Sequence, residues 1–198
     1  MALCLAHAAA GYLAYEALRP AGRHEMGLLV TAVVAANLPD ADFLPGLAIG
    51  HATAFHRVFT HTLAAAIVAT ALVWVIARWR RAMRPAALAS VAGAAYLTHL
   101  LLDWMTVDAV PPPGIQLFWP FSDAWMHAPW SVLGEIIVDS GSRVGFVQSL
   151  LTPAALQAWT REVGVLAAAV ALVHLARGVF GARTALSTGD SLEGQGDA

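Results

Sequence analysis

The chain has 198 residues, of which 59% are hydrophobic and only 12% are charged, about half of the roughly 25% charged share of soluble domains. The mean hydropathy of +0.65 exceeds what a soluble fold of this size can bury, so the composition excludes an ordinary soluble domain and predicts membrane residence. A net charge of −2 excludes a basic surface for nucleic acid, and the single cysteine excludes an internal disulfide and a cysteine-rich zinc site.

Five apolar stretches predict an all-α, polytopic membrane helical bundle with about five membrane helices. In chain order they cover residues 2–18, 26–38, 61–76, 86–105 and 153–180. The first two are short for crossing alone, since a span needs about 20 residues. The second stretch ends before Pro39, because proline disfavours helical geometry in the residue that precedes it.

Two further segments lie outside these helices. The long loop at residues 108–152 contains the aromatic run Phe118-Trp119-Pro120-Phe121, which is typical of a membrane interface. Within this loop, residues 130–138 are expected to form a short interfacial helix. Residues 187–198 are polar and glycine-rich and predict a disordered tail, which leaves residues 1–186 as a single transmembrane domain.

Arginines indicate the orientation, because short cytoplasmic loops carry an excess of positive charge. Four of them fill the turn between the third and fourth apolar stretches, namely Arg78, Arg80, Arg81 and Arg84. This turn is therefore expected in the cytoplasm, with the N-terminus and the long aromatic loop outside. The chain is then a multi-pass protein whose helix ends fall alternately on the two sides.

Histidines and aspartates gather at the outer ends of four helices in this topology. A carboxylate costs about 2.5–3.5 kcal/mol near the membrane centre and less toward the interface, and several close together also repel one another. A pair of divalent cations removes both costs, which helix–helix hydrogen bonds do not. The candidate metal ligands are His7, Asp40, Asp42, His56, His61, His99 and Asp103.

Local spacing supports this set. His99 and Asp103 are four residues apart, so both side chains lie on one helical face as a shared metal requires. His56 is expected at the mouth of the third helix and His61 within it. Two divalent ions are expected, with zinc first, although manganese or iron also suits histidine and aspartate ligands.

The order of the motifs resembles that of a known family. Leu38-Pro39-Asp40-Ala41-Asp42, His56-Arg57-x-x-Thr60-His61 and His99-x-x-x-Asp103 follow an early histidine and precede the aromatic run. This order resembles the YdjM-like family of bacterial inner-membrane metal-dependent hydrolases over roughly residues 5–125, and that family is distantly similar to the zinc-dependent phospholipase C and single-strand nuclease superfamily. The resemblance implies an inner-membrane location and phosphoester cleavage. It also implies metals held by His7, Asp40 or Asp42, His61, His99 and Asp103.

The expected function is metal-dependent hydrolysis of a phosphoester in a phospholipid or lipid-linked substrate, at a site facing the extracytoplasmic side. Metals lower the pKa of water and polarise phosphoryl oxygens. Asp40 and Asp42 are expected to bridge the metals or act as base, and Arg57 to orient the phosphate. Trp119 and Phe121 are expected to contact substrate as a wall or lid over its acyl chains.

Two functions without hydrolysis stay open from the sequence. One is a divalent-metal transporter or sensor, which should carry ligands near the bilayer midplane and polar residues along a path. The inner half is nearly bare apart from Glu16 and His174, which favours an enzyme. The other is a membrane scaffold in which a closed metal site staples short helices together.

Overall fold

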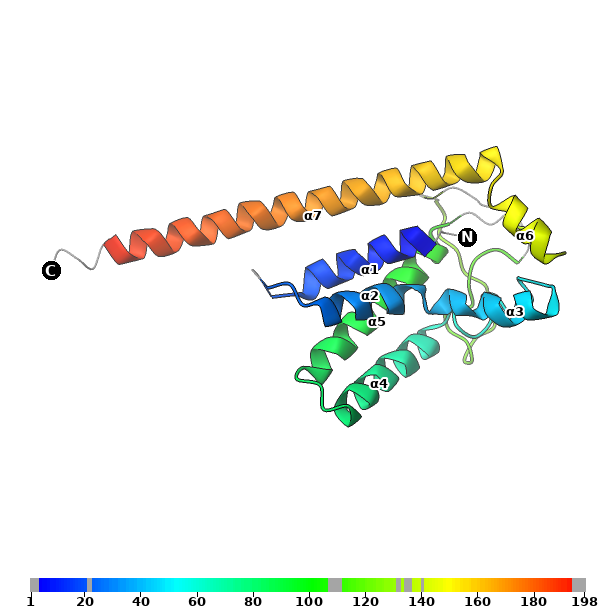
Figure 1. Ribbon diagram of the computed structural model, residues 1–198, viewed down its shortest axis with the longest axis horizontal. Helices are drawn as coiled ribbons and strands as arrows, with labels where there is room; N and C mark the ends of the chain where they lie inside the picture. Colours follow the sequence, from blue (N-terminus) through cyan, green and yellow to red (C-terminus); the bar gives the residue numbers. More distant parts are fainter. Residues whose placement is uncertain are drawn as a thin grey trace.

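The computed structural model describes residues 4–20, 23–106, 112–130, 133, 137–139 and 141–193, with side chains described as far as residue 179. Over these residues the fold is all-α, with seven α-helices and one 3-10 helix (Figure 1). The elements are α1 (Cys4–Leu18), α2 (Met26–Asn37), η1 (Pro39–Asp42), α3 (Phe43–Ile49), α4 (Leu63–Trp79), α5 (Pro85–Trp104), α6 (Arg143–Ser149) and α7 (Pro153–Glu193).

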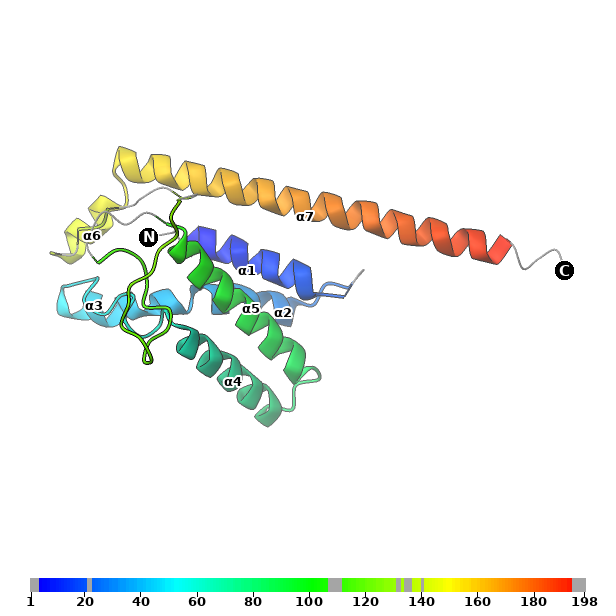
Figure 2. The ribbon, with the colours of Figure 1, turned by 180° about the vertical axis from the view of Figure 1, so that it is seen from behind.

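Helices α1, α2, α4 and α5 form a bundle in which α2 and α5 contact each other and α1, while α4 packs on α5 (Figures 1 and 2). Small residues bring these helices close, as is usual between membrane helices. A Cβ on Gly11 of α1 would lie 2.7 Å from the carbonyl oxygen of Ala32 in α2. A Cβ on Gly93 of α5 would lie 2.7 Å from Oγ1 of Thr70 in α4.

Helix α7 runs along α1, and its C-terminal part projects beyond the bundle (Figure 1). Tyr12 Oη lies 2.7 Å from His174 Nε2, and the buried Glu16 carboxylate pairs with Arg19 at 2.7 Å and Arg177 at 3.6 Å. The helix continues to Glu193, past its expected end at residue 180 and into the segment expected as a tail. The disordered tail and the domain boundary at residue 186 stay predictions.

The structure shows two or three candidate membrane spans. Helix α5 has 20 residues, and α7 has 27 over Pro153–Val179. The third candidate joins Met26–Asn37 and Pro39–Ile49, which are bent by 48° at their break. Helix α4 is apolar but has 17 residues, and α1 has 15, so the expected five spans stay a prediction.

Several differences from the expected elements have local causes. Helices α3 and α6 were not expected, because seven residues are too few to produce a clear hydrophobic period. The expected interfacial helix at residues 130–138 falls largely outside the described residues.

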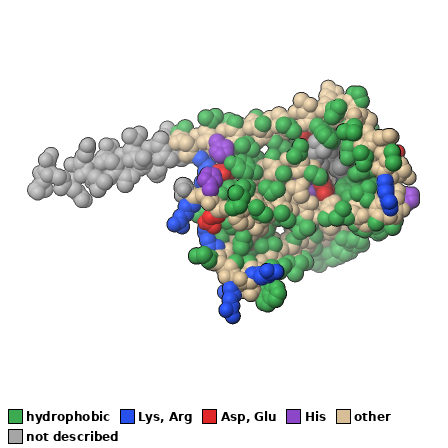
Figure 3. Space-filling view, viewed as in Figure 1, with side chains coloured by type: hydrophobic (Ala, Val, Ile, Leu, Met, Phe, Trp, Pro, Cys, Tyr) green, Lys and Arg blue, Asp and Glu red, His purple; other side chains and the backbone are tan. Residues whose placement is uncertain are grey.

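Side chains of the described part are distributed as expected for a protein in lipid. Hydrophobic side chains spread over the flanks of the bundle, and basic side chains gather mainly at one end (Figure 3). That end includes the turn between α4 and α5, where Arg84 pairs with Glu25. The fold therefore separates an arginine-rich end from the opposite end, where α3 and α6 lie (Figure 1).

Candidate metal centre

Four chain segments converge at the end of the bundle opposite the arginine-rich turn (Figures 1 and 2). His7 lies near the start of α1, Asp40 in η1, and His61 immediately before α4, while His99 and Asp103 lie near the end of α5. Four of these side chains are completely buried, namely His7, His61, His99 and Asp103. Asp40 is 9% exposed. Polar groups from distant parts of the sequence thus share one buried site.

Two local features position the middle of this site. Pro39 ends α2 and begins the 3-10 turn that holds Asp40, so the bend redirects this carboxylate toward the bundle. At the start of α4, Thr62 Oγ1 accepts a hydrogen bond from the Ala65 N–H at 3.0 Å, as an N-cap does. The helix therefore begins at Leu63, and the expectation that His61 lies within it is wrong.

The ligand atoms form two overlapping groups. One comprises His7, Asp40, His99 and Asp103, and the other comprises Asp40, His56, His61 and Asp103. Within each group the ligand atoms all lie within 4.8 Å of one another. Asp40 and Asp103 belong to both groups. A carboxylate has two oxygens and can bridge two cations, so the arrangement could hold a pair of metal ions.

Distances between facing atoms fit shared metal ions. His7 Nε2 lies 3.7 Å from Asp40 Oδ2 and 3.6 Å from Asp103 Oδ1. His99 Nε2 lies 3.7 Å from Asp40 Oδ1 and 3.6 Å from Asp103 Oδ2. Tetrahedral ligands at about 2.1 Å from a metal are separated by roughly 3.4 Å, whereas N–H···O hydrogen bonds are about 2.9 Å long. The four separations are therefore closer to the distance between two ligands of one metal ion than to the length of a hydrogen bond.

His7 supplies a further test of this fit. Its ring is completely buried and stacks on that of His99 with centroids 3.7 Å apart, and neither of its nitrogens has a hydrogen-bond partner among the described residues. A buried polar atom without a partner costs about 1–3 kcal/mol. Coordination of a metal by Nε2 would remove part of that cost. The residues present therefore fit a metal on the His7 side of the centre.

His99 and His61 are held by contacts outside the cluster. His99 Nδ1 lies 2.7 Å from the Ala36 carbonyl oxygen, which can only accept, so Nδ1 carries the proton and Nε2 presents its lone pair. His61 Nδ1 lies 3.0 Å from Thr60 Oγ1. Its Nε2 lies 3.1 Å from Asp103 Oδ2 and 3.0 Å from His99 Nε2. Both rings thus direct Nε2 into the centre.

Asp42 lies outside both ligand groups, although it was predicted as a ligand or base. Its carboxylate accepts from His56 Nδ1 at 2.9 Å, from the Arg57 backbone N–H at 3.1 Å and from Thr60 Oγ1 at 2.6 Å. Its Oδ2 also lies 3.4 Å from His61 Nδ1. A carboxylate behind a ligating histidine fixes the ring and raises its basicity. The geometry therefore suits Asp42 to orienting His56 and His61.

Replacing Asp42 by Asn should weaken metal binding without removing a ligand. Loss of such a carboxylate typically lowers affinity 10- to 100-fold, so Asp42→Asn should bind the same number of zinc ions with affinity reduced by about that factor. Competition titration against a zinc chelator measures both quantities. Asp123→Asn, in the exposed aromatic loop, is the matched control. A reduced number of bound ions in Asp42→Asn would instead identify Asp42 as a ligand.

The carboxylates favour positive charge on His61 but not on His56. Burial lowers the pKa of His56, and its hydrogen bond with Asp42 does not fully offset that effect. Burial also acts to lower the pKa of His61, but hydrogen bonds with Asp103, Asp40 and Asp42 outweigh it and raise the pKa well above its usual value. A divalent cation could supply that positive charge in place of the proton.

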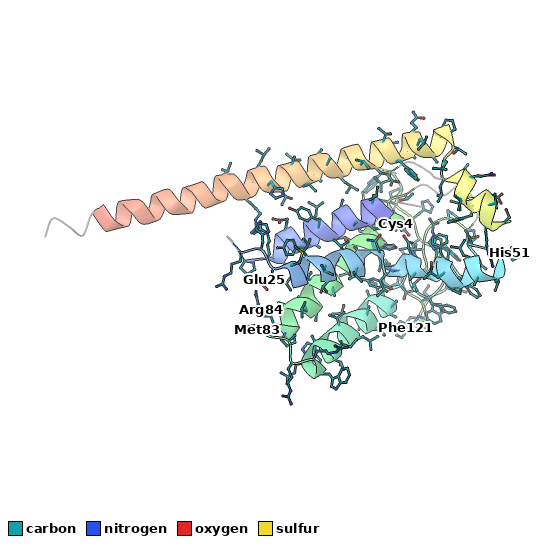
Figure 4. All side chains as sticks on the ribbon, in the orientation of Figure 1. Cys4, Glu25, His51, Met83, Arg84 and Phe121 are labelled. Carbon is teal, nitrogen blue, oxygen red and sulfur yellow. The ribbon has the colours of Figure 1, made fainter. Side chains whose placement is uncertain are left out.

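The residues predicted to contact substrate lie beside this centre. Arg57 is 9% exposed and has a left-handed φ of 68°, a strained conformation that clusters at functional sites. Trp119 packs edge-on against Phe59 with ring centroids 5.1 Å apart. Phe121, the last residue of the aromatic run, is 93% exposed and lies beside the beginning of α4 (Figure 4). Their contacts with substrate stay predictions.

One supporting residue was missed by the sequence analysis. Tyr96 is buried in α5, and its hydroxyl donates to the Thr60 carbonyl oxygen at 2.6 Å, which holds the segment before α4 in place. Tyr96 precedes His99 by three residues and so shares its helical face. That spacing is the sequence signal that could have indicated its role.

Comparisons with known proteins relate the chain to inner membrane proteins. The chain matches the family model described as YdjM inner membrane protein over residues 1–184. It is 38% identical over 112 residues to Inner membrane protein YbcI of Escherichia coli (strain K12), an alignment that covers 54% of this chain and 61% of that protein. The chain thus spans less than two thirds of this relative, and no solved structure matches. Because the family model covers nearly the whole chain, this protein belongs to the YdjM family of inner membrane proteins.

Proposed function

We propose that this protein is a membrane-embedded, metal-dependent hydrolase that cleaves a phosphoester in a lipid or lipid-linked substrate. The observation that supports the proposal most is the sharing of Asp40 and Asp103 by two buried ligand groups. Shared carboxylates would hold two cations side by side, an arrangement found in phosphatases and nucleases. Two zinc ions are the proposed cofactor, and manganese or iron would also suit these ligands.

The chain's own groups would divide the work of binding and orientation. His7 and His99 would hold one ion and His56 and His61 the other, with the two shared carboxylates between them. When bound, the metals supply a polarised phosphoryl oxygen and a water of lowered pKa. Asp42 would keep both His56 and His61 in position through its hydrogen bonds.

Substrate contacts would come from the more accessible side of the centre. Asp40 is 9% exposed whereas Asp103 is completely buried, so the substrate would approach the centre from the Asp40 side. Arg57 would orient the phosphate through its planar donors. Trp119 and Phe121 would cover the apolar part of the substrate near the beginning of α4.

The centre is proposed to face the extracytoplasmic side. Arg78 and Arg84 lie in or beside the turn between α4 and α5, and the ligand groups lie at the opposite end of the bundle (Figures 1 and 3). Because positive residues favour cytoplasmic loops, this separation supports a cytoplasmic turn and an outward-facing metal centre.

The inner half of the bundle supports hydrolysis over metal transport. Glu16 pairs with Arg19 and Arg177, and His174 contacts the Tyr12 hydroxyl. These polar groups therefore link helices α1 and α7 and are engaged with each other. In a transporter, polar groups of this kind would instead have to face a path along which the cation crosses the membrane.

Zinc analysis and a substrate panel test the proposal. Purified, zinc-loaded protein should hydrolyse a phospholipid or a soluble aryl phosphoester, and His61→Ala should reduce this activity to background because it removes a ligand of one ion. His127→Ala, in the exposed aromatic loop, should behave as wild type. Wild-type protein that holds two zinc ions and hydrolyses no phosphoester would contradict the proposal, and so would full activity in His61→Ala.

A further inference from the structure

An apolar groove lies between α4 and residues 38–60, a segment that includes η1 and α3. Its volume is about 720 Å³, within the range of ligand pockets. Leu38, Pro45 and Phe59 contribute to one wall, and Val68 and Leu72 of α4 contribute to the other. Nearly all of its lining is hydrocarbon, which suits an occupant without polar groups along most of its length.

The polar lining of this groove is next to the metal centre. Asp42 and Thr60 line it, and they are the residues that hold His56 and His61. From there the groove follows α4 toward the arginine-rich turn as far as Ile76. A molecule bound along it would therefore place one end close to the ligand groups and the remainder among apolar side chains.

The length of the groove matches one leaflet of a bilayer. It follows α4 from Ala65 to Ile76, a distance of about 16 Å at 1.5 Å per residue. The hydrocarbon core of a bilayer is about 30 Å thick, so one leaflet contributes about 15 Å. A lipid of the leaflet on the metal side could lay one chain along the groove with its headgroup at the level of the centre.

A second groove on the other face of α4 lacks this connection. It has a volume of about 730 Å³ and is lined by residues of α4 and α5 that include Ile67, Trp74 and Gly93. Its lining includes no residue of the two ligand groups and none of the residues that support them. Nonspecific contact with membrane lipid would occur equally at both grooves, so the second groove serves as a control for the first.

We propose that the first groove binds a single long hydrocarbon chain of a membrane lipid and thereby presents the lipid's phosphate headgroup to the metal centre. This inference rests on the proposed hydrolase function and specifies its substrate class as long-chain amphiphiles. A lipid in the first groove would gain dispersion contacts along the apolar walls and, in addition, contact between its phosphate and the metal centre, whereas a lipid in the second groove would gain the dispersion contacts alone. Of these two grooves, the first is the one whose lining reaches the residues that hold His56 and His61.

Two adjacent residues of α4 provide a matched pair of variants. Val68 is 56% exposed and lines the first groove, and Ile67 is 69% exposed and lines the second. Val68→Trp should obstruct the first groove, and Ile67→Trp adds the same side chain to the second. Leu72→Trp obstructs the first groove at another depth and replaces Val68→Trp if that variant does not fold.

Photocrosslinking tests binding without relying on activity. The full chain is reconstituted in phosphatidylethanolamine vesicles that contain phosphatidylglycerol with a diazirine midway along one acyl chain. Peptide mapping of wild type and Ile67→Trp should locate labels on the walls of the first groove, and Val68→Trp should lose most of them. Equal labelling of both grooves, or unchanged labelling of the first groove in Val68→Trp, would overturn the inference.

An activity measurement separates this inference from the proposed function. The ratio of turnover of a long-chain phospholipid to that of a short-chain phosphoester with the same headgroup should fall about tenfold or more in Val68→Trp. The ratio should not change in Ile67→Trp. Groove labelling without hydrolysis of either substrate would leave the binding site standing and remove the hydrolase. Hydrolysis with an unchanged ratio in Val68→Trp would support the hydrolase function and rule out the first groove as the binding site of the hydrocarbon chain.

Discussion

Asp103→Asn is expected to abolish zinc binding at both positions of the metal centre, because Asp103 belongs to both ligand groups. His7→Ala should remove only the ion of the first group, and His56→Ala only that of the second, since each of these residues belongs to one group. Asparagine retains the size of aspartate but not its charge, so the change is in coordination and not in packing. Loss of both ions in Asp103→Asn, with loss of one ion in each histidine variant, is expected only if carboxylates are shared between the two metal positions.

Elemental analysis of purified protein at saturating zinc measures this series directly. Wild type should contain two ions per chain, His7→Ala and His56→Ala one each, and Asp103→Asn none. Circular dichroism and size-exclusion chromatography verify that each variant is folded. Two zinc ions in Asp103→Asn would rule out its proposed role, and one ion in wild type would rule out the two-metal centre.

Removing the metal is expected to lower the thermal stability of the wild-type protein substantially. A ligand that binds only the folded state stabilises it by about 2.7 kcal/mol when present at 100 times its Kd, so two ions contribute about 5 kcal/mol. At about 2–4 °C per kcal/mol for a chain of this length, a strong chelator should lower the Tm by roughly 10–20 °C. The expected loss arises because the ligands of each ion come together only in the folded state, so metal binding stabilises that state alone.

Tryptophan fluorescence during heating, with and without chelator, checks this result. Asp103→Asn should show no chelator effect, because it binds no metal to lose. Its Tm should lie well below that of zinc-loaded wild type, since it lacks the stabilisation that bound metal supplies. Equal Tm values for zinc-loaded and chelated wild type would show that no metal contributes to this fold.

Apolar runs were sufficient to predict the main helices of the fold. The stretch at residues 86–105 corresponds closely to α5 (Pro85–Trp104), and the stretch that begins at Pro153 corresponds to α7. The short helices α3 and α6 could not be predicted, because seven residues are too few to show a hydrophobic period. The number of membrane crossings depends on tilt and bending, which hydropathy does not encode.

Most of the candidate site was visible in the sequence because metal ligands are chemically restricted. The four-residue spacing of His99 and Asp103 placed both on one face of α5, and both lie in the centre. The different positions of Asp40 and Asp42 could not be predicted, since two residues of one short turn diverge only in three dimensions. Asp40 reaches both ligand groups, while Asp42 holds the histidines.

The spread of the ligands along the chain constrains the biogenesis of this protein. His7 is synthesised first, yet neither ligand group is complete before Asp103, near the end of α5, has emerged and been inserted. The proposed metals could therefore not be held by a partly translated chain, and metal binding would follow insertion of the bundle. The metals would then be acquired from the compartment that the ligand end faces, so activity would follow the metal supply there and not that of the compartment where the chain is made.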